Sequence, residues 1–312
     1  MNKRVIVITG PTASGKSGVG IELAKRINGV VISADSMQIY KKLDVGTAKV
    51  TKIEAQGIKH ELIDILDINE EFNVSQYKTM CYEKIEEIFN EGKTPIIVGG
   101  TGLYINAIVN NMIFDRVDEK EEQQIEKELL ELTKDKDSDE LYELLEAMDK
   151  EATLNIERGN DKRVIRAIKL SLLGNKKSDI QKRNDLWNKN DSKYEFLVTY
   201  IDMPRDLLYD RINKRVDIMV EQGVLDEAKF VYDNKQKGIT ACQAIGYKEF
   251  FEYIEGEKTL EECIETLKQK SRNYAKRQIT WFKKLKDKFI VDGTKTKEEI
   301  VENILREYNE KN

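Results

Sequence analysis

The sequence predicts an α/β protein with a parallel β-sheet core and a helical insertion in the middle of the chain. Short apolar runs, namely RVIVIT (4–9), VVISAD (30–35) and PIIVGG (95–100), alternate with longer segments of helical periodicity. This alternation is typical of βαβ crossovers in a parallel sheet. The pattern fades after about Asn111 and returns with EFLVTYI (195–201), so the residues between them are expected to form a separate helical region.

Two helices are expected between the first three strands. Apolar residues at helical spacing (Val19, Leu23 and Ile27) predict a helix over Ser17–Asn28. A second, longer helix precedes the third strand, and its apolar residues are Tyr77, Ile85 and Phe89. Both helices lie where the crossovers of a parallel sheet need them.

The second half of the chain is predicted to be mainly helical. Residues 119–174 carry helical patterns, with Gly174 as a stop signal. Further helices are expected over Arg205–Glu221, Leu225–Lys237 and Thr259–Asp287, and FIVD (289–292) is a candidate strand. The last helix begins with a capping box, Thr259 and Glu262. We therefore expect an α/β core formed by residues 1–114 and 191–312, interrupted by a helical insertion over 115–190.

Composition excludes several classes of protein. The chain has 312 residues, 40% apolar and 35% charged, which is enough to bury a sizeable core. The three cysteines show no CxxC spacing and His60 is the single histidine, so we expect neither structural zinc nor a multi-histidine metal site. No run of 18 apolar residues occurs, and the first strand begins almost at once. We therefore expect no membrane span, no signal peptide and a cytoplasmic location.

The charge is unevenly distributed along the chain. The net charge of −5 alone argues against nucleic-acid binding. However, residues 158–183 contain 9 basic and 2 acidic residues, and residues 268–288 contain 9 basic and 1 acidic residue. Such tracts can bind a polyanion, or they can be solvated helix faces. Charge alone favours the second interpretation.

The segment GPTASGKS matches the phosphate-binding pattern G-x-x-x-x-G-K-[ST]. It follows a predicted strand and precedes a predicted helix, as in P-loop NTPase-like folds. Its backbone N–H groups and the helix dipole would attract phosphate oxygens, Lys16 would add a charge, and Ser17 could hold Mg²⁺. The residues expected to bind a diphosphate or triphosphate are Gly10, Pro11, Thr12, Ala13, Ser14, Gly15, Lys16 and Ser17.

The residues that follow the strands limit the reactions that this site could catalyse. PIIVGGTG ends without the carboxylate that an ATPase uses around its magnesium, so hydrolysis is doubtful. Asp35 follows the second strand and is expected at the sheet edge that faces the ligand crevice. It could be a base, an N-cap or an outer magnesium ligand. Two reactions fit: a kinase, in which Asp35 orients a hydroxyl, and an alkyl transferase, in which diphosphate leaves.

Six blocks in order along the chain resemble the tRNA dimethylallyltransferases, the IPP transferase family. The blocks are GPTASGKS (10–17), ISADSMQIYKKLDVGTAK (32–49), VGGTGLYI (98–105), RVD (215–217), AIGYKEF (244–250) and SRNYAKRQITWF (271–282). The resemblance covers most of the chain. It implies transfer of a dimethylallyl group from dimethylallyl diphosphate to N6 of adenosine 37, next to the anticodon of tRNA.

The resemblance also implies residue roles. The phosphate loop would hold the diphosphate of the prenyl donor rather than ATP. Asp35 would accept the N6 proton, while Lys16, Thr101 and Arg215 would stabilise the charge of the leaving diphosphate, with Mg²⁺ at Ser17. Arg215 also lies one helical turn after Arg211, so both could point from one face.

Contacts with tRNA are expected from two regions. The target adenine would have to leave the anticodon-loop stack and contact Asp35, Ser36, Met37 and Gln38, with Thr101 beside them. The Gln38 amide can pair with an adenine edge. The basic tracts would contact the tRNA backbone through Lys162, Arg163, Arg166, Arg272, Lys276 and Arg277. Lys169 is expected on the same face as Arg166. The aromatic residues Tyr274 and Trp281 continue an apolar stripe and are therefore expected in the core.

Three departures from the family pattern lie outside the proposed proton-transfer and diphosphate residues. Glu61 stands beside His60 where members have two histidines, Val50 replaces a proline, and ERGND (157–161) stands where members often have HPND. We expect His60 to be a hydrogen-bonded residue beside the sheet, and the protein to act as a monomer.

Three rival functions remain at this point. They are a P-loop kinase of a nucleotide or small metabolite, a transferase that alkylates free adenine nucleotides, and a non-catalytic RNA-binding protein. The helical insertion argues against the second, and the intact Lys16, Ser17, Asp35 and Thr101 argue against the third.

Overall fold

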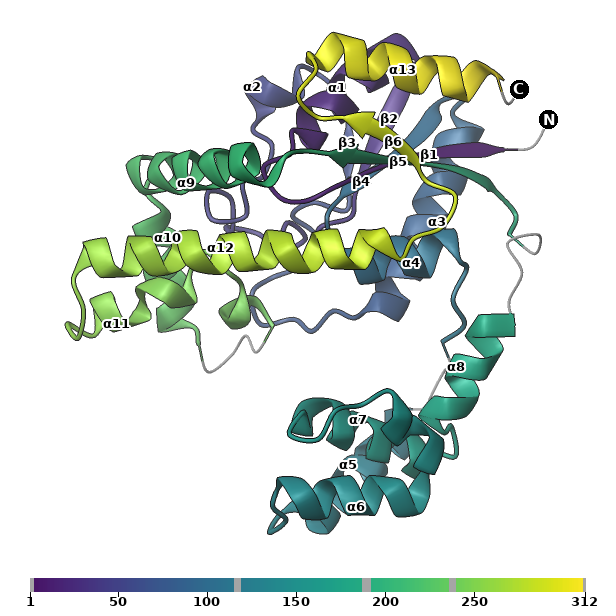
Figure 1. Cartoon of the computed structure of the whole chain (residues 1–312), viewed down its shortest axis with the longest axis vertical. Helices are drawn as coiled ribbons and strands as arrows, with labels where there is room; N and C mark the ends of the chain where they lie inside the picture. The colour runs from purple at the N-terminus through teal and green to yellow at the C-terminus, as the bar shows by residue number, and fades with distance from the viewer. Residues whose placement is uncertain (1–2, 115–118, 187–191, 236–239, 311–312) are drawn as a thin grey trace. The chain divides into compact units, whose positions relative to one another are not determined.

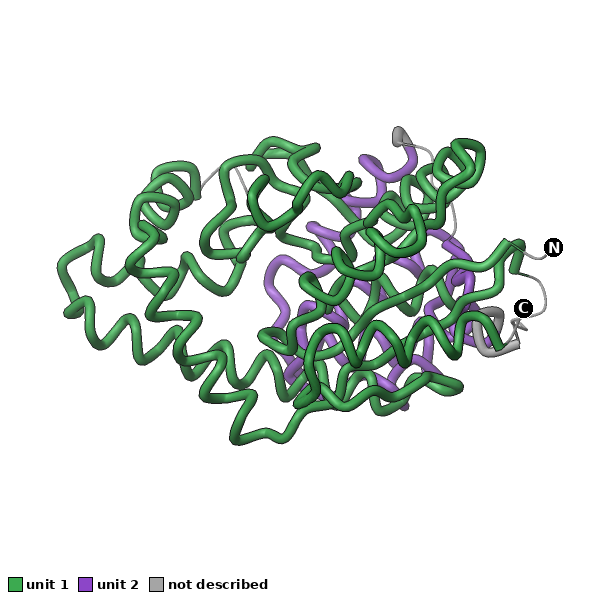
Figure 2. The backbone as a smooth tube through the Cα atoms, turned by 90° about the horizontal axis from the view of Figure 1, so that it is seen from above, with its two compact units in different colours: residues 1–109, 192–312 green, residues 110–191 purple. Residues whose placement is uncertain are grey.

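The computed structural model describes residues 3–114, 119–186, 192–235 and 240–310. The chain forms two compact units, one from Met1–Val109 with Ser192–Asn312 and the other from Asn110–Asp191 (Figure 2). The insertion expected over 115–190 lies within the second unit. Each unit has its own hydrophobic core, and each is described separately below.

The first unit contains a parallel sheet of six strands in the order β3-β2-β4-β1-β5-β6, which confirms the predicted fold class (Figure 1). The strands are β1 (Arg4–Thr9), β2 (Gly29–Ser33), β3 (His60–Glu61), β4 (Thr94–Gly99), β5 (Glu195–Asp202) and β6 (Phe289–Asp292). β1 lies between β4 and β5, with Ile8 opposite Val98 on one side and Thr199 on the other. The two-residue strand β3 was not predicted, because it is too short to carry a periodic signal.

Helices cover the sheet and extend beyond its carboxyl edge. They are α1 (Lys16–Arg26), α2 (Lys52–Ala55), α3 (Val74–Asn90), α4 (Gly102–Val109), α9 (Arg205–Glu221), α10 (Val224–Asp233), α11 (Phe251–Ile254), α12 (Leu260–Lys283) and α13 (Lys297–Glu310), with short 3-10 turns η3 (Ala241–Gln243) and η4 (Lys248–Phe250). α9 has the predicted bounds, and the capping box of Thr259 and Glu262 starts α12 as predicted. α9 and α12 pack along each other (Figure 1).

Three helices end earlier than predicted, and the first of them is α1, which ends at Arg26 rather than Asn28. α12 ends at Lys283 rather than Asp287, because the chain must turn there to enter β6. Asp287 adopts φ 53, a left-handed conformation that cannot continue a right-handed helix. α10 ends at Asp233, and the remainder of its predicted range, 236–237, lies outside the described residues.

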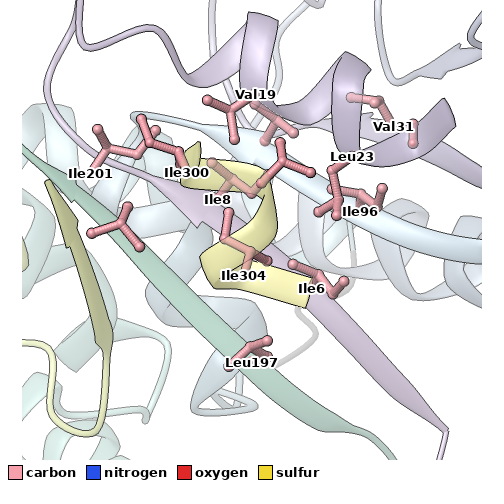
Figure 3. Packing of buried hydrophobic residues seen from close by; sticks show 14 residues of the cluster. Ile6, Ile8, Val19, Leu23, Val31, Ile96, Leu197, Ile201, Ile300 and Ile304 are labelled. Atoms are coloured by element: carbon pink, nitrogen blue, oxygen red, sulfur yellow. The ribbon is translucent and has the colours of Figure 1, made fainter. Parts of the chain in front are cut away.

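The core of the first unit is built on the central strand (Figure 3). Ile6 and Ile8 of β1 are fully buried, and Leu23 of α1 packs against them. The C-terminal helix α13, which the sequence analysis did not identify, adds Ile300 and Ile304 to the same cluster. Their spacing of four residues places both on the buried face of α13.

The second unit is helical in its described residues. It contains α5 (Glu119–Thr133), α6 (Ser138–Met148), η1 (Lys150–Leu154), α7 (Asp161–Leu172) and α8 (Lys177–Leu186). Its core is formed by Leu141 and Leu145 of α6 and by Val164 and Ile168 of α7. Gly174, with φ 71, follows α7 as the predicted stop.

None of the helices within residues 3–114, 119–186, 192–235 and 240–310 combines the length and the hydropathy that a membrane span requires.

We predict that Ile304→Ala destabilises the first unit by about 2–5 kcal/mol, because it leaves a cavity in the core at a fully buried position. Urea denaturation followed by circular dichroism measures this change. Asn309→Ala, on the exposed side of the same helix, is the matched control and should change stability by less than about 0.5 kcal/mol. Equal stability of the two variants would show that α13 is not part of the core.

Candidate active site

The phosphate loop connects β1 to α1 at the carboxyl edge of the sheet. Gly10 has φ 154, and a Cβ there would lie 2.9 Å from the Ile201 carbonyl oxygen of the neighbouring strand. Gly15 has φ 90 and immediately precedes α1. The glycines of the motif are therefore required by close approach and by backbone conformation. The loop leaves the first N–H groups of α1 facing the crevice.

Gln278 of α12 fastens the phosphate loop to the end of β4. Its Oε1 accepts a hydrogen bond of 2.7 Å from the Thr12 backbone N–H, and its Nε2 donates one of 3.0 Å to the Gly100 carbonyl. The side chain is 6% exposed, so both bonds lie in a shielded environment. The sequence analysis missed Gln278. The available signal was an uncharged polar residue within the apolar stripe of α12.

Lys16 is buried deeply enough for its protonation to change. Burial and the nearby charge of Arg215 lower the pKa of its ammonium, the Asp35 carboxylate opposes both effects, and the net result is a pKa of about 7. The Nζ atom donates a hydrogen bond of 2.6 Å to the Pro11 carbonyl. Lys16, Arg215 and Asp35 therefore share one electrostatic environment at the phosphate loop.

Asp35 lies two residues beyond the end of β2. Its Oδ1 accepts a hydrogen bond of 2.9 Å from the Met37 backbone N–H, so it caps a turn and not a helix. Among the described residues, Met37 is the one that donates to this carboxylate, which leaves Oδ2 for a ligand. The neighbouring Ser36 N–H donates to Thr101 Oγ1 over 3.1 Å, and the Thr101 N–H donates to the Ala34 carbonyl over 3.1 Å. Asp35 and Thr101 are thus held side by side.

A cavity of about 430 Å³ opens beside these residues, within the first unit. Thr12, Asp35 and Arg215 are among its lining residues, as are Ser36 and Met37. The structure thereby places Thr12 of the phosphate loop, Asp35 and Arg215 of α9 around one cavity. Its size is within the range of small-molecule sites.

Arg215 reaches the cavity, whereas Arg211 is exposed and does not line it. A spacing of four residues places the two side chains on one face of α9, and Arg215 is the one that lines the cavity. Burial lowers the pKa of the Arg215 guanidinium, and the carboxylates of Asp35 and Glu54 oppose that effect.

The two aromatic residues of α12 are not core residues. Tyr274 lines the cavity, and burial together with the Asp35 charge raises the pKa of its hydroxyl to about 12. Trp281 is 42% exposed and covers Gly102, where a Cβ would lie 2.4 Å from the indole. The apolar residues of α12 continue at helical spacing through Tyr274 and Trp281. However, this face of the helix packs on the core only up to the cavity, so neither side chain is fully buried.

Gln38 has a structural role in this conformation. Its Oε1 accepts a hydrogen bond of 3.0 Å from the Ser33 hydroxyl, and its Nε2 donates one of 3.3 Å to the Thr47 carbonyl. Gln38 is not a lining residue of the cavity. Its amide is therefore occupied in bracing the segment that follows β2.

The candidate tRNA-binding residues of α12 differ in their surroundings. Arg277 lines the cavity and lies 5.5 Å from the centre of the Tyr274 ring. Lys276 is exposed. Arg272 donates a hydrogen bond of 2.6 Å to Asn213 on α9, so its guanidinium is partly occupied within the protein.

In the second unit, Lys162, Arg163 and Arg166 are exposed on α7. Lys169 is different, because its ammonium forms ion pairs of 2.6 and 2.9 Å with Glu122 and Glu126 of α5. Two carboxylates therefore neutralise the charge that Lys169 would add to the basic face. Lys177, which the sequence analysis did not single out, joins that face instead. Burial and the charges of Arg163 and Arg166 lower the pKa of its ammonium.

Among the described residues, no three histidine, cysteine or acidic side chains are grouped closely enough to hold a metal ion. Ser17 is exposed in the first turn of α1. His60 lies in β3, and its Nδ1 is 2.9 Å from the Ile58 carbonyl oxygen, as expected for a hydrogen-bonded residue of the sheet.

The chain is similar over most of its length to several known proteins. Residues 38–285 match the model of the family described as IPP transferase. A tRNA dimethylallyltransferase of Acetivibrio thermocellus is 44% identical over 96% of both chains, and one of Finegoldia magna is 45% identical over 91% of this chain and 89% of its own. The structure of a tRNA isopentenylpyrophosphate transferase from Staphylococcus epidermidis covers 99% of both chains with 40% identity and a TM-score of 0.72. The structure of a eukaryotic dimethylallyltransferase acting on tRNA has a TM-score of 0.79 and 32% identity, over 93% of this chain and 74% of its own. With a parallel sheet, a phosphate loop and a cavity that joins Asp35 to Arg215, the chain belongs to the IPP transferase family.

Proposed function

We propose that this protein transfers a dimethylallyl group from dimethylallyl diphosphate to N6 of adenosine 37 in tRNA. One observation carries the proposal: Asp35 and Arg215 line the cavity that begins at the phosphate loop. A base and a cation that face one space are what an alkyl transfer with a diphosphate leaving group needs. The names of the relatives, tRNA dimethylallyltransferase, supply the donor and the acceptor.

In the proposed reaction, the adenine N6 forms a bond to C1 of the allyl group while the C1–O bond breaks. The electron pair of that bond leaves with diphosphate, and the N6 proton passes to the Asp35 carboxylate. Lys16 and Arg215 stabilise the negative charge that develops on the leaving oxygen. Thr101, held against Ser36, can donate its hydroxyl proton to the same diphosphate.

The chain's residues fit a magnesium ion only as part of a diphosphate complex. Ser17 offers one hydroxyl at the start of α1, and the described residues group no carboxylates around it. Mg²⁺ bound between Ser17 and the diphosphate would add positive charge on the leaving group. A single protein ligand is compatible with such a site, because Mg²⁺ usually keeps several water molecules and phosphate oxygens among its ligands.

The rival functions are less well supported. β4 ends in Gly99, followed by Gly100 and Thr101, so no carboxylate stands there to support ATP chemistry. A transferase for free nucleotides would not need the exposed basic face of α7, Arg163 and Arg166. We further propose that the protein acts as a monomer in the cytoplasm.

A transfer assay tests the proposal. Labelled dimethylallyl diphosphate and Mg²⁺ are mixed with unmodified tRNA, with AMP, or with ATP and AMP. We expect label in tRNA alone, and a loss of at least about 100-fold in Asp35→Ala, which lacks the base. Label in AMP would instead indicate a free-nucleotide transferase. Phosphate exchange without prenyl transfer would indicate a kinase.

The depressed pKa of Lys16 predicts proton uptake on ligand binding. With a pKa of about 7, the amine is mostly neutral at pH 8 in the free protein, and a bound diphosphate favours its charged form. Affinity for inorganic diphosphate should therefore fall as the pH rises above 7, by up to about tenfold per pH unit. Calorimetry at pH 8 in two buffers of different ionisation enthalpy measures the protons taken up, after correction for the ligand's own ionisation. No uptake would contradict a Lys16–diphosphate contact.

The basic residues should affect tRNA more than the prenyl donor. Arg166→Glu and Lys276→Glu reverse charges that we assign to contacts with the tRNA backbone. Each should raise the KM for tRNA by about tenfold, with the KM for dimethylallyl diphosphate unchanged. Lys258→Glu is the matched control, because its ammonium is paired with Glu252 at the surface of the first unit. Equal effects on both substrates, or on neither, would refute the assignment.

A further inference from the structure

One end of the cavity is apolar. Val216 and Met219 of α9, Leu267 of α12 and Ala244 line it, and the same residues belong to or pack against the hydrophobic cluster around Tyr247 and Phe250. The phosphate loop and Asp35 lie at a polar part of the same cavity. If the proposed function holds, the hydrocarbon tail of the donor gains most by lying against these apolar side chains.

A short backbone segment closes the cavity on this side. We call residues 44–48 the Gly46 wall; Gly46, Thr47 and Ala48 line the cavity. A Cβ at Gly46 would lie 2.5 Å from the Tyr247 ring, and a Cβ at Gly246 would lie 2.9 Å from the Gly46 carbonyl oxygen. The wall is therefore in direct contact with Tyr247, so it can move outward only if Tyr247 moves with it.

Glu227 of α10 holds the middle of this wall. Its Oε1 accepts hydrogen bonds from the backbone N–H groups of Asp44 (3.0 Å) and Val45 (2.8 Å). Its Oε2 accepts one from the Gly46 N–H (3.1 Å) and one from the Tyr247 hydroxyl (2.9 Å). One carboxylate thus binds three consecutive amides and joins them to the cluster behind. Bonds to an ionised acceptor are stronger than those between neutral groups.

Other bonds hold the two ends of the wall. The Lys49 ammonium bridges Asp44 and Asp64, each over 2.5 Å, and Gln38 donates to the Thr47 carbonyl. Loss of Glu227 would therefore release the middle of the wall while leaving its ends anchored. Because the ends stay anchored, we expect loss of Glu227 to change the shape of the cavity without unfolding the segment.

We propose that Glu227 is the positioning residue that limits the length of the prenyl chain. By holding the Gly46 wall against Tyr247, it keeps the apolar end of the cavity at a size that suits a five-carbon allyl group. A ten-carbon geranyl chain would need the wall to move. The inference rests on the proposed function, because it concerns the donor used in that reaction.

The experiment compares dimethylallyl diphosphate with geranyl diphosphate as donors to tRNA. In Glu227→Gln, the amide NH₂ replaces one of the two acceptor oxygens and faces backbone N–H donors, so the middle of the wall is held by fewer and weaker hydrogen bonds. We expect the ratio of kcat/KM for the five-carbon over the ten-carbon donor to fall at least about fivefold. Affinity for inorganic diphosphate should not change, because the phosphate loop is held separately by Gln278.

Two further variants complete the test. Asp226→Asn removes an exposed carboxylate from the same turn of α10 and should leave the ratio unchanged. Met219→Ala enlarges the apolar end directly and should lower the ratio. If Met219→Ala lowers it but Glu227→Gln does not, the tail lies at this end and Glu227 does not control it, which overturns the inference. Equal losses with both donors in Glu227→Gln would overturn it as well, since they indicate a merely structural role.

The outcome for the wild-type chain separates the two proposals. Transfer of dimethylallyl to tRNA by the wild type, with an unchanged donor ratio in Glu227→Gln, refutes the inference and leaves the proposed function standing. No transfer by the wild type refutes both. Should Glu227→Gln fail to fold, Tyr247→Phe removes only the hydroxyl that contacts Glu227 and should give a smaller fall in the same ratio.

Discussion

The site depends on three charges held close together in a shielded space. Burial and the charge of Arg215 lower the pKa of Lys16, the charge of Asp35 raises it, and the net result is a pKa of about 7. Two cations beside one carboxylate leave an excess of positive charge, which an anionic ligand can neutralise. The site is therefore arranged for a diphosphate before one arrives, and the cost of burying these charges is recovered when it binds.

The fold supplies that arrangement through the carboxyl edge of the sheet. β1 leads into the phosphate loop, β2 leads to Asp35, and β4 leads to Thr101, while α9 and α12 bring Arg215 and Gln278 from the distant second half of the sequence. Gln278 links two of these loops, so the loops that follow β1 and β4 move together. The Gly46 wall depends on Glu227 in the same way, through backbone amides rather than through a side chain of the wall itself.

The fold and the central site residues could be predicted from sequence, because they depend on local signals. Apolar runs gave the five longer strands, and the glycine spacing of the phosphate loop identified Lys16. Contacts between distant segments carried no local signal. Gln278 interrupts the apolar stripe of α12, but its partners on two distant loops cannot be identified from that, and Glu227 is one acidic residue among several in its helix. The ion pairs of Lys169 with α5 likewise leave no mark on the sequence of α7. Tyr274 was assigned to the core because helical spacing shows which residues share a face, but not where that face stops being covered.

The most direct test of the charge arrangement is the affinity of Asp35→Asn for inorganic diphosphate, measured beside Lys16→Met. If Asp35 serves the acceptor amine while Lys16 serves the diphosphate, Asp35→Asn binds diphosphate at least as tightly as the wild type, because it loses a nearby negative charge. Its prenyl transfer is nevertheless lost, and Lys16→Met loses both binding and transfer. A fall in the diphosphate affinity of Asp35→Asn as large as that of Lys16→Met would contradict this division of roles.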